Sequence, residues 1–420
     1  MFPNLNRKSF TNHIYNDEDL RVPILKLTAI YGANGSGKSN ILESFNFLKK
    51  FAIEKDFLDS QPQISINKFR LVSLDNNEPI ELSVELYANK QIYIYNTKIN
   101  DSLISEELFL SGIGKTNDRL IFSRSGSNIH IGGGEKIDND LIDNLLIRNP
   151  KSSIISLNKE FPVIKDKSLN IIYDWFVTNT EYLSLQRKVP SLISMFYNNK
   201  EMFSLANDVI NKIGLGVKEL VIDSKGIENI LGNDNEGLKN AIIEKLEQGS
   251  VSQMKNDRTL LNIVKEKDEV IVRQLLFKHV GINNFESNLE YECQSDGTVK
   301  ILNLIPAIYN IINKECLYFI DEIENSIHPI LIKKLIQYIA NLKTKGQLIF
   351  TTHETELLNQ KDVLRPDEVW LTEKYEGSTK LYSLNDFKIH NTINIKNGYL
   401  EGRYGGIPFI GNLEILDDEL

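Results

Sequence analysis

The sequence lacks a long apolar run and is poor in cysteine. Its 420 residues include two cysteines, Cys293 and Cys316, whose spacing fits neither a metal site nor a disulfide framework, as expected for a reducing cytoplasm. The longest apolar candidate, 301–312, is broken by two asparagines and a proline, which argues against a membrane span. Polar residues between Asn4 and Lys8 argue against a secretory signal peptide. We therefore expect a cytoplasmic protein with no membrane partner.

An excess of basic residues is also missing. The chain carries 48 Lys and Arg against 57 Asp and Glu, a formal net charge of −9. A net negative charge disfavours a protein that coats nucleic acid through its overall electrostatic field. A local basic groove would still be compatible with this net charge. Nucleic acid thus stays open as a partner. The chain shows no sustained heptad register, so no long coiled-coil arm is expected.

Hydrophobic patterning predicts an α/β chain in three parts. A buried strand at 24–31 leads into a helix at 38–50, and alternating apolar and polar residues over 64–132 predict antiparallel strands. The segment from 165 to about 280 is mostly helical by pattern. From Ser295 onward, helices and strands alternate, which predicts a parallel βαβ arrangement. The expected domains are 1–164, 165–280 and 281–420.

The segment from Gly32 to Ser39, GANGSGKS, fits the phosphate-binding pattern G-x-x-x-x-G-K-[ST] in full. It follows a predicted strand and opens a predicted helix, so backbone N–H groups and the helix N-terminus can converge on phosphate oxygens. Lys38 is expected to reach the β- and γ-phosphates of a nucleotide, and the Ser39 hydroxyl to bind Mg²⁺. The alternative is a glycine-rich turn that matches by chance, at about one per cent for this length. The residues expected to bind nucleotide here are Asn34, Gly35, Ser36, Gly37, Lys38, Ser39 and Asn40.

A second candidate site follows the apolar segment from Cys316 to Ile320, which ends in two carboxylates. Asp321 is expected to hold Mg²⁺, directly or through water, and Glu322 to polarise the attacking water. Such roles suffice because phosphoryl transfer needs mainly positioning and charge neutralisation. The alternative is a strand that ends in a polar cap before the next helix. Behind a complete phosphate loop, the catalytic interpretation is preferred.

Three further motifs resemble those of ABC/SMC ATPases. Ser295-Asp-Gly297-Thr is similar to their signature loop, the segment from Glu324 to Pro329 to their D-loop, and His353 at a strand end to their switch histidine. The resemblance implies a P-loop ABC/SMC-type ATPase head with an antiparallel β subdomain and a helical insertion. It also implies that Ser295 and Gly297 contact the γ-phosphate of ATP bound by another protomer, hence a homodimer or higher homo-oligomer. His353 would sense that phosphate and act with Glu322 in hydrolysis.

Each of these motifs has a plainer interpretation when taken alone. The serine loop is an ordinary helix start, and a lone histidine is usually structural. Neither Gln61 nor Gln63 makes a convincing Q-loop glutamine, and no arginine finger can be named. The usual N-terminal strands of this head are shortened or absent unless the segment from His13 to Asp19 replaces them.

The C-terminal part resembles one prokaryotic group, the abortive-infection-type AAA ATPases. The similarity lies in Leu381 to Lys388 and in Tyr399 to Pro408, which contains a Gly-Arg-Tyr-Gly-Gly run. It implies an ATPase that senses phage infection through a phage-encoded trigger and controls a separate effector, a nuclease or toxin. The ATPases of PARIS-type and Septu-type systems are similar in kind. Asp138-Asn-Asp140 has the spelling of a nuclease motif but lies in a predicted polar loop, so no nuclease activity is expected in this chain.

Other functions fit parts of the pattern. A DNA repair or recombination ATPase acting on DNA ends would have a basic surface and DNA-stimulated hydrolysis, which the net charge disfavours. A transporter's ATP-binding subunit would lack the middle insertion, and a scaffold without turnover would have no use for Glu322. The insertion, roughly 165–280, is the expected surface for a partner or trigger.

Overall fold

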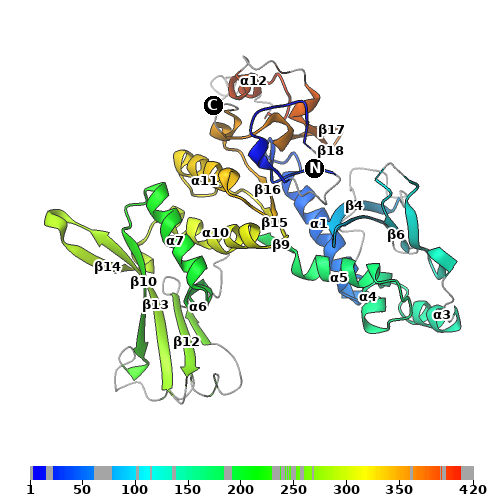
Figure 1. Ribbon diagram of the computed structural model, residues 1–420, viewed down its shortest axis with the longest axis horizontal. Coiled ribbons are helices and arrows are strands. Elements are labelled where there is room, and N and C mark those ends of the chain that lie inside the picture. The colour runs from blue at the N-terminus through cyan, green and yellow to red at the C-terminus, as the bar shows by residue number, and fades with distance from the viewer. Residues whose placement is uncertain are drawn as a thin grey trace, which may run out of the picture.

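The centre of the molecule is a six-stranded sheet with the strand order β18–β17–β3–β16–β15–β9 (Figure 1). The computed structural model describes residues 3–15, 22–60, 78–100, 104–113, 116–134, 139–183, 192–228, 237, 242, 244, 246, 252–255, 260–266, 269–359, 363–387, 389 and 394–407. Neighbouring strands from β17 to β9 are parallel, and the edge strand β18 is antiparallel. The strands are β3 (Leu27–Gly32), β9 (Thr180–Leu183), β15 (Leu317–Ile320), β16 (Gln347–Thr351), β17 (Val369–Tyr375) and β18 (Ser378–Ser383).

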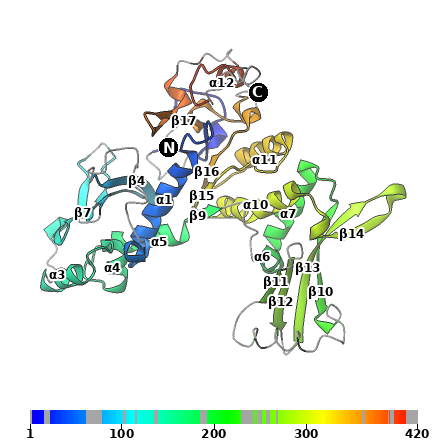
Figure 2. The same ribbon diagram turned by 180° about the vertical axis from the view of Figure 1, so that it is seen from behind.

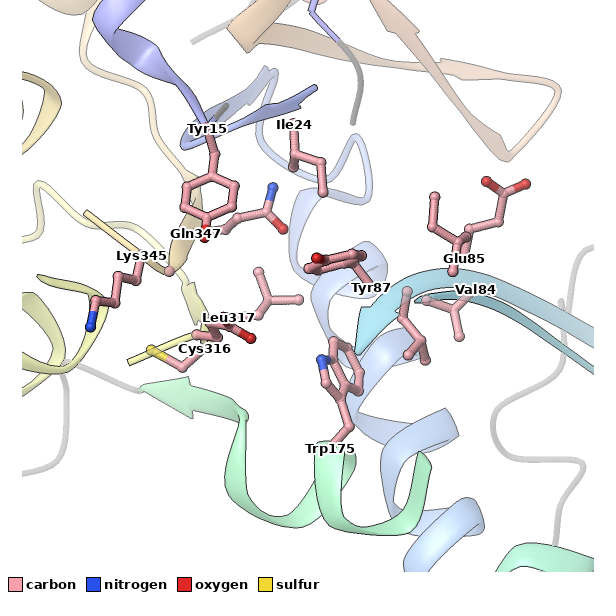
Figure 3. Close-up of a pocket in the computed structure, with 14 residues that line it drawn as sticks. Tyr15, Ile24, Val84, Glu85, Tyr87, Trp175, Cys316, Leu317, Lys345 and Gln347 are labelled. Atoms are coloured by element: carbon pink, nitrogen blue, oxygen red, sulfur yellow. The ribbon is translucent and has the colours of Figure 1, made fainter. Parts of the chain in front are cut away.

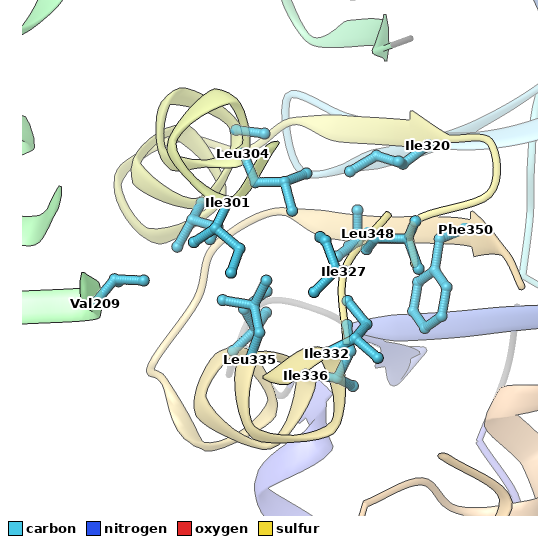
Figure 4. Close-up of a cluster of buried hydrophobic side chains, with 14 of the residues drawn as sticks. Val209, Ile301, Leu304, Ile320, Ile327, Ile332, Leu335, Ile336, Leu348 and Phe350 are labelled. Atoms are coloured by element: carbon cyan, nitrogen blue, oxygen red, sulfur yellow. The ribbon is translucent and has the colours of Figure 1, made fainter. Parts of the chain in front are cut away.

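Helices cover both faces of this sheet, because side chains alternate between the faces along each strand. Ala29 and Tyr31 of β3 belong to the cluster with α10 (Asp296–Asn313) and α11 (Pro329–Asn341), whereas Ile30 packs with α1 (Lys38–Ile53). Figure 4 shows the first of these clusters, where the two helices meet the sheet. Because β3, β16 and β15 are parallel, their C-terminal ends lie at the same edge of the sheet, and the loops that follow them leave the sheet there.

The predicted antiparallel region forms a separate lobe beside α1. Its sheet is a meander of β4 (Ile80–Ala88), β5 (Gln91–Ile99), β6 (Ile104–Leu110), β7 (Arg119–Ser125) and β8 (Asn128–Ile131). Asn89 and Lys90, both with positive φ, make the tight turn between β4 and β5, as hairpin geometry requires. Helices α2 (Phe57–Ser60), α3 (Asn139–Arg148), α4 (Ile154–Glu160) and α5 (Ser168–Thr178) complete this part. The predicted α/β head with an antiparallel β subdomain is thus confirmed.

The prediction of a helical insertion at 165–280 is wrong for 219–226, 252–255, 260–266 and 269–280, although Ile242, Glu244 and Leu246 are helical as predicted. Helices α5, α6 (Leu192–Asn198) and α7 (Lys200–Ile213) do form in the first half. From Glu219 the chain instead builds an antiparallel sheet in the order β10–β13–β12–β11, with β14 paired to β13. The strands are β10 (Glu219–Gly226), β11 (Ser252–Lys255), β12 (Leu260–Glu266), β13 (Glu269–Val280) and β14 (Glu286–Glu290).

The error has a physical cause. The strand β13 has 12 residues, which is long enough for its apolar spacing to suit a helix as well, and cross-strand packing decides between the two. The sheet of β10 to β13 packs against α6 and α7. It lies on the far side of the molecule from the β4–β8 lobe (Figure 2). Helix α5 packs instead with α4 and α1 at that lobe, so the boundary expected at 165 passes through one packed unit.

The N-terminal segment is tied to the region just before β17. Strand β1 (Ile14–Tyr15) pairs with β2 (Ile24–Leu25), and the buried side chains of His13 and Glu368 lie 3.0 Å apart. The guanidinium of Arg365, also buried, donates to the backbone oxygens of Asn4 and Ser9. A short strand therefore does form within the segment proposed to replace the usual N-terminal strands. Within the described ranges, no helix combines the length and apolar character needed to cross a membrane.

Candidate nucleotide-binding site

The phosphate loop joins the C-terminal end of β3 to the first residue of α1. Gly35 and Gly37 have φ values of 74° and 100°, a region that costs other residues about 1–2 kcal/mol. Gly37 is also the N-cap of α1, and no side chain in the described part of the chain caps the helix there. The free N–H groups of the first helical turn and the turned loop make a cradle that fits a phosphate group.

Lys38 lies folded back over this loop. Its ammonium donates to the backbone oxygens of Gly32 (2.9 Å) and Ala33 (3.2 Å), and the residue is 7% exposed. Burial lowers the pKa of Lys38, while the charges of nearby Asp321, Glu322 and Glu324 act to raise it. An ammonium has three donors, so one is left for a ligand oxygen without loss of these loop contacts.

The two carboxylates after β15 are fixed by the neighbouring strand β16. The Thr351 hydroxyl donates to Asp321 Oδ1 (2.5 Å) and accepts a hydrogen bond from the backbone N–H of Glu322 (2.8 Å). Glu322 itself has a φ of 48°, and strain of about 1–3 kcal/mol at a non-glycine residue of this kind is typical of functional sites. Thr351 was not identified in the sequence, because no motif marks it.

His353 follows β16 and lies close to the same charges. Its backbone N–H donates to Glu324 Oε1 at 2.6 Å, and Glu324 Oε2 is buried without a partner among the described residues. Burial, followed by the charge of Lys38, lowers the pKa of the His353 imidazole, while Glu324, Glu322 and Asp321 act to raise it. Glu324 is thus a further residue of this site. The sequence placed it in the D-loop without a role of its own.

The structure therefore brings Lys38, Asp321, Glu322 and His353 together at one edge of the sheet. The other residues of the phosphate loop differ in exposure. Asn34, Gly35 and Asn40 are exposed, Ser36 is buried and Ser39 is half-buried in the first turn of α1. No group of three His, Cys, Asp or Glu side chains with metal-binding geometry occurs within the described ranges. A magnesium ion at Ser39 and Asp321 would therefore complete its shell with water and phosphate oxygens, as is usual for this ion.

Ser295 caps its own helix, whereas Gly297 lies against the D-loop-like segment of the same chain. Ser295 caps α10, its hydroxyl accepting from the Thr298 N–H at 3.2 Å. A Cβ on Gly297 would lie 2.9 Å from the Ser326 backbone oxygen, so glycine permits this close approach. The Lys300 ammonium also donates to the D-loop, at Asn325 Oδ1 (2.8 Å). These contacts link the signature-like helix to the D-loop rather than to Lys38.

A cavity lies at the opposite edge of the main sheet (Figure 3). It is lined by Tyr87, Trp175, Cys316, Lys345 and Gln347, among others. Burial raises the pKa of the Cys316 thiol to about 11. Since β15 and β16 begin here and the phosphate loop follows the other end of the parallel strands, this cavity is separate from the nucleotide site. Gln61 and Gln63, the Q-loop candidates, and Asp138 fall outside the described residues.

Solved structures resemble the chain weakly. The SMC head bound to the C-terminal winged-helix domain of ScpA is 14% identical, with 86% of this chain and 91% of that chain covered and a TM-score of 0.35. The SMC head domain from Thermotoga maritima is 10% identical, with 88% and 96% covered and a TM-score of 0.33. A Pyrococcus furiosus SMC head with an extended coiled coil, bound to the C-terminal domain of ScpA, is 13% identical, with 86% and 91% covered and a TM-score of 0.29. These scores are too low to add to the fold described above.

A family match is more informative. None of the curated proteins compared with this chain matches it. Residues 27–359 match the family described as "AAA domain, putative AbiEii toxin, Type IV TA system". The match begins at β3 and runs through the phosphate loop, the acidic strand end and His353. Because it spans most of the chain, the protein belongs to this family of AAA domains.

Proposed function

We propose that the protein is an ABC/SMC-like ATPase that hydrolyses ATP with Mg²⁺ and controls a separate effector in antiphage defence. The observation that carries the catalytic part is the meeting of Lys38, Asp321 and Glu322 behind a complete phosphate loop. The N-terminus of α1 has no side-chain cap among the described residues, and such a helix start is suited to binding a phosphate group.

Each residue has a role that follows from its position. The loop N–H groups and Lys38 bind the β- and γ-phosphates, and Ser39 with Asp321 would hold Mg²⁺. When bound, that ion neutralises charge on the phosphates. Glu322, set beside Asp321 by Thr351, orients a water molecule and accepts its proton. His353, held by Glu324, completes the side of the site that faces the γ-phosphate.

Turnover is proposed to need a second copy of the chain. Ser295 and Asp296 are exposed at the start of α10, where they would be available to a nucleotide held by another protomer. An arrangement with two-fold symmetry would give each of two sites one phosphate loop and one signature loop.

The defence role rests on the family and on the C-terminal resemblance. The family description names an AbiEii toxin and a type IV toxin–antitoxin system. We propose the part of the segment 165–280 that forms α6, α7 and the β10–β13 sheet as the surface for the effector or a phage-encoded trigger. The adjoining β13–β14 turn exposes Ile282 and Phe285 to 87% and 70%, which supports an interaction at this end of the molecule.

The test is the mass of the complex in solution. Glu322→Gln would be co-expressed with its genomic neighbours and measured by native mass spectrometry with and without ATP. An ATP-dependent dimer or larger assembly that carries a neighbouring protein supports the proposal. A monomer in the presence of ATP contradicts the shared site. Stimulation of wild-type hydrolysis by DNA ends, without a protein partner, would favour the DNA repair alternative.

A further inference from the structure

The hairpin of β17 and β18 closes over the phosphate loop from the C-terminal part of the chain. The Thr372 hydroxyl donates to the Tyr31 backbone oxygen at 3.0 Å and lies 2.6 Å from the Ser36 hydroxyl, which must therefore be the donor in that pair. The Thr379 hydroxyl donates to the Ser36 backbone oxygen at 2.8 Å. Two threonines on adjacent strands thus hold a single residue of the loop.

The fit is close enough to require two of the loop's glycines. A Cβ on Gly32 would lie 1.9 Å from Thr372 Oγ1, and one on Gly37 would lie 2.1 Å from Thr379 Oγ1. Real Cβ atoms do not come this near to an oxygen. These glycines therefore allow the hairpin to reach the loop, besides allowing the loop to turn.

The Gly-Arg-Tyr-Gly-Gly segment packs on the other side of the same hairpin. The Tyr382 hydroxyl of β18 donates to the Tyr404 backbone oxygen at 2.8 Å. Gly405 has a φ of 70°, and a Cβ there would lie 2.4 Å from the Tyr382 hydroxyl. Tyr399 lies in α12 (Ile395–Leu400), just before this segment. Its ring contacts the ring of Tyr31 edge-on, with 5.8 Å between the ring centroids, and Tyr31 directly precedes the phosphate loop.

We propose that the β17–β18 hairpin, braced by residues 399–406, is a positioning element for the phosphate loop, with Thr379 and Thr372 as its positioning residues. The inference rests on the proposed nucleotide binding. By holding the Ser36 carbonyl away from the ligand, Thr379 keeps the loop's N–H groups turned inward before a nucleotide arrives. Preorganisation of this kind acts on affinity, because the loop does not have to be ordered during binding.

The test compares Thr379→Val with Thr379→Ser in calorimetric titrations with Mg²⁺–ADP, which avoids both turnover and ATP-dependent assembly. Thr379 is exposed on an edge strand, so valine is expected to leave the melting temperature unchanged. We expect ADP affinity to fall about threefold to tenfold in Thr379→Val, the effect of one lost hydrogen bond, and to return in Thr379→Ser. Ser378→Ala, whose hydroxyl donates to the Tyr375 backbone oxygen within the hairpin, is the matched control and should bind as wild type.

Tyr382→Phe tests the brace, since it removes only the hydroxyl that reaches Tyr404. A fall in ADP affinity with unchanged melting temperature supports the proposal. If the wild-type protein binds nucleotide and both Thr379→Val and Tyr382→Phe bind equally well, the inference is overturned while the proposed function stands. If the wild-type protein binds no nucleotide, the proposed function itself fails.

Discussion

Replacement of Thr351 by valine should misalign Asp321 and Glu322 while leaving both carboxylates in the site. Thr351 is fully buried, and valine keeps nearly the same shape. The change removes the hydroxyl's bond to Asp321 and its acceptor for the Glu322 N–H. A neutral hydrogen bond contributes about 1 kcal/mol and a charge-assisted one about 1.5–3 kcal/mol. Since Asp321 is half-buried and can recover water, the lower figures apply, and we expect a loss of about 2.5 kcal/mol in stability around this strand end.

The catalytic effect should exceed what stability alone predicts. With Asp321 and Glu322 no longer aligned, we expect the maximal ATP hydrolysis rate to fall about tenfold to hundredfold, as for other misplaced groups. The Mg²⁺ concentration needed for half-maximal activity should rise, because Asp321 loses its orientation. Hydrolysis would be measured by phosphate release across a magnesium titration, with Thr351→Ser expected to recover most of the rate.

Thr352→Val provides the matched control. Thr352 is equally buried, but its hydroxyl accepts from the Glu354 N–H at 3.0 Å and, among the described residues, makes no hydrogen bond to Asp321 or Glu322. It should lower the melting temperature slightly and leave the magnesium dependence unchanged. A wild-type rate and magnesium dependence in Thr351→Val would refute the assignment of Thr351 as the link between the two acidic residues. So would an equal loss of activity in both valine variants.

Three further predictions concern the same site. Lys38→Ala should weaken ATP binding about 100-fold or more, because charge-assisted bonds to phosphate are lost and three carboxylates are left unopposed; calorimetric binding within a few-fold of wild type would contradict this. Glu322→Gln should bind ATP normally but accumulate an ATP-bound assembly, visible in native mass spectra, whereas rapid turnover would remove Glu322 from its role. Burial and Lys38 lower the pKa of His353 below its ordinary 6.5, so the imidazole is neutral at pH 7 and the acid limb of the hydrolysis profile should lie below pH 6.5. Glu324→Gln removes a charge that raises the pKa of His353, so the loss of hydrolysis at acidic pH should occur at a lower pH in this variant. An unchanged pH profile would argue that another group titrates.

The local parts of the site could be predicted from the sequence. The phosphate loop depends on glycines that adopt positive φ, a strand before them and a helix after them, all within one short segment. The acidic pair after β15 is equally local, and the alternation of α10, β15, α11 and β16 follows from hydrophobic periodicity. Periodicity failed at β10 and at β11 to β13, because strand pairing rather than local preference decided the outcome there.

The supports of the site were decided by the tertiary structure alone. Thr351 lies 30 residues from Asp321, and Thr379 lies 343 residues from the Ser36 carbonyl that it holds. No local pattern marks a threonine for such a role, since its position depends on which strands become neighbours and in which register. The parallel pairing of β17 with β3 places Thr372 opposite Gly32. That pairing places the C-terminal hairpin beside the phosphate loop, a position that the family-like segment beginning at Leu381 did not indicate.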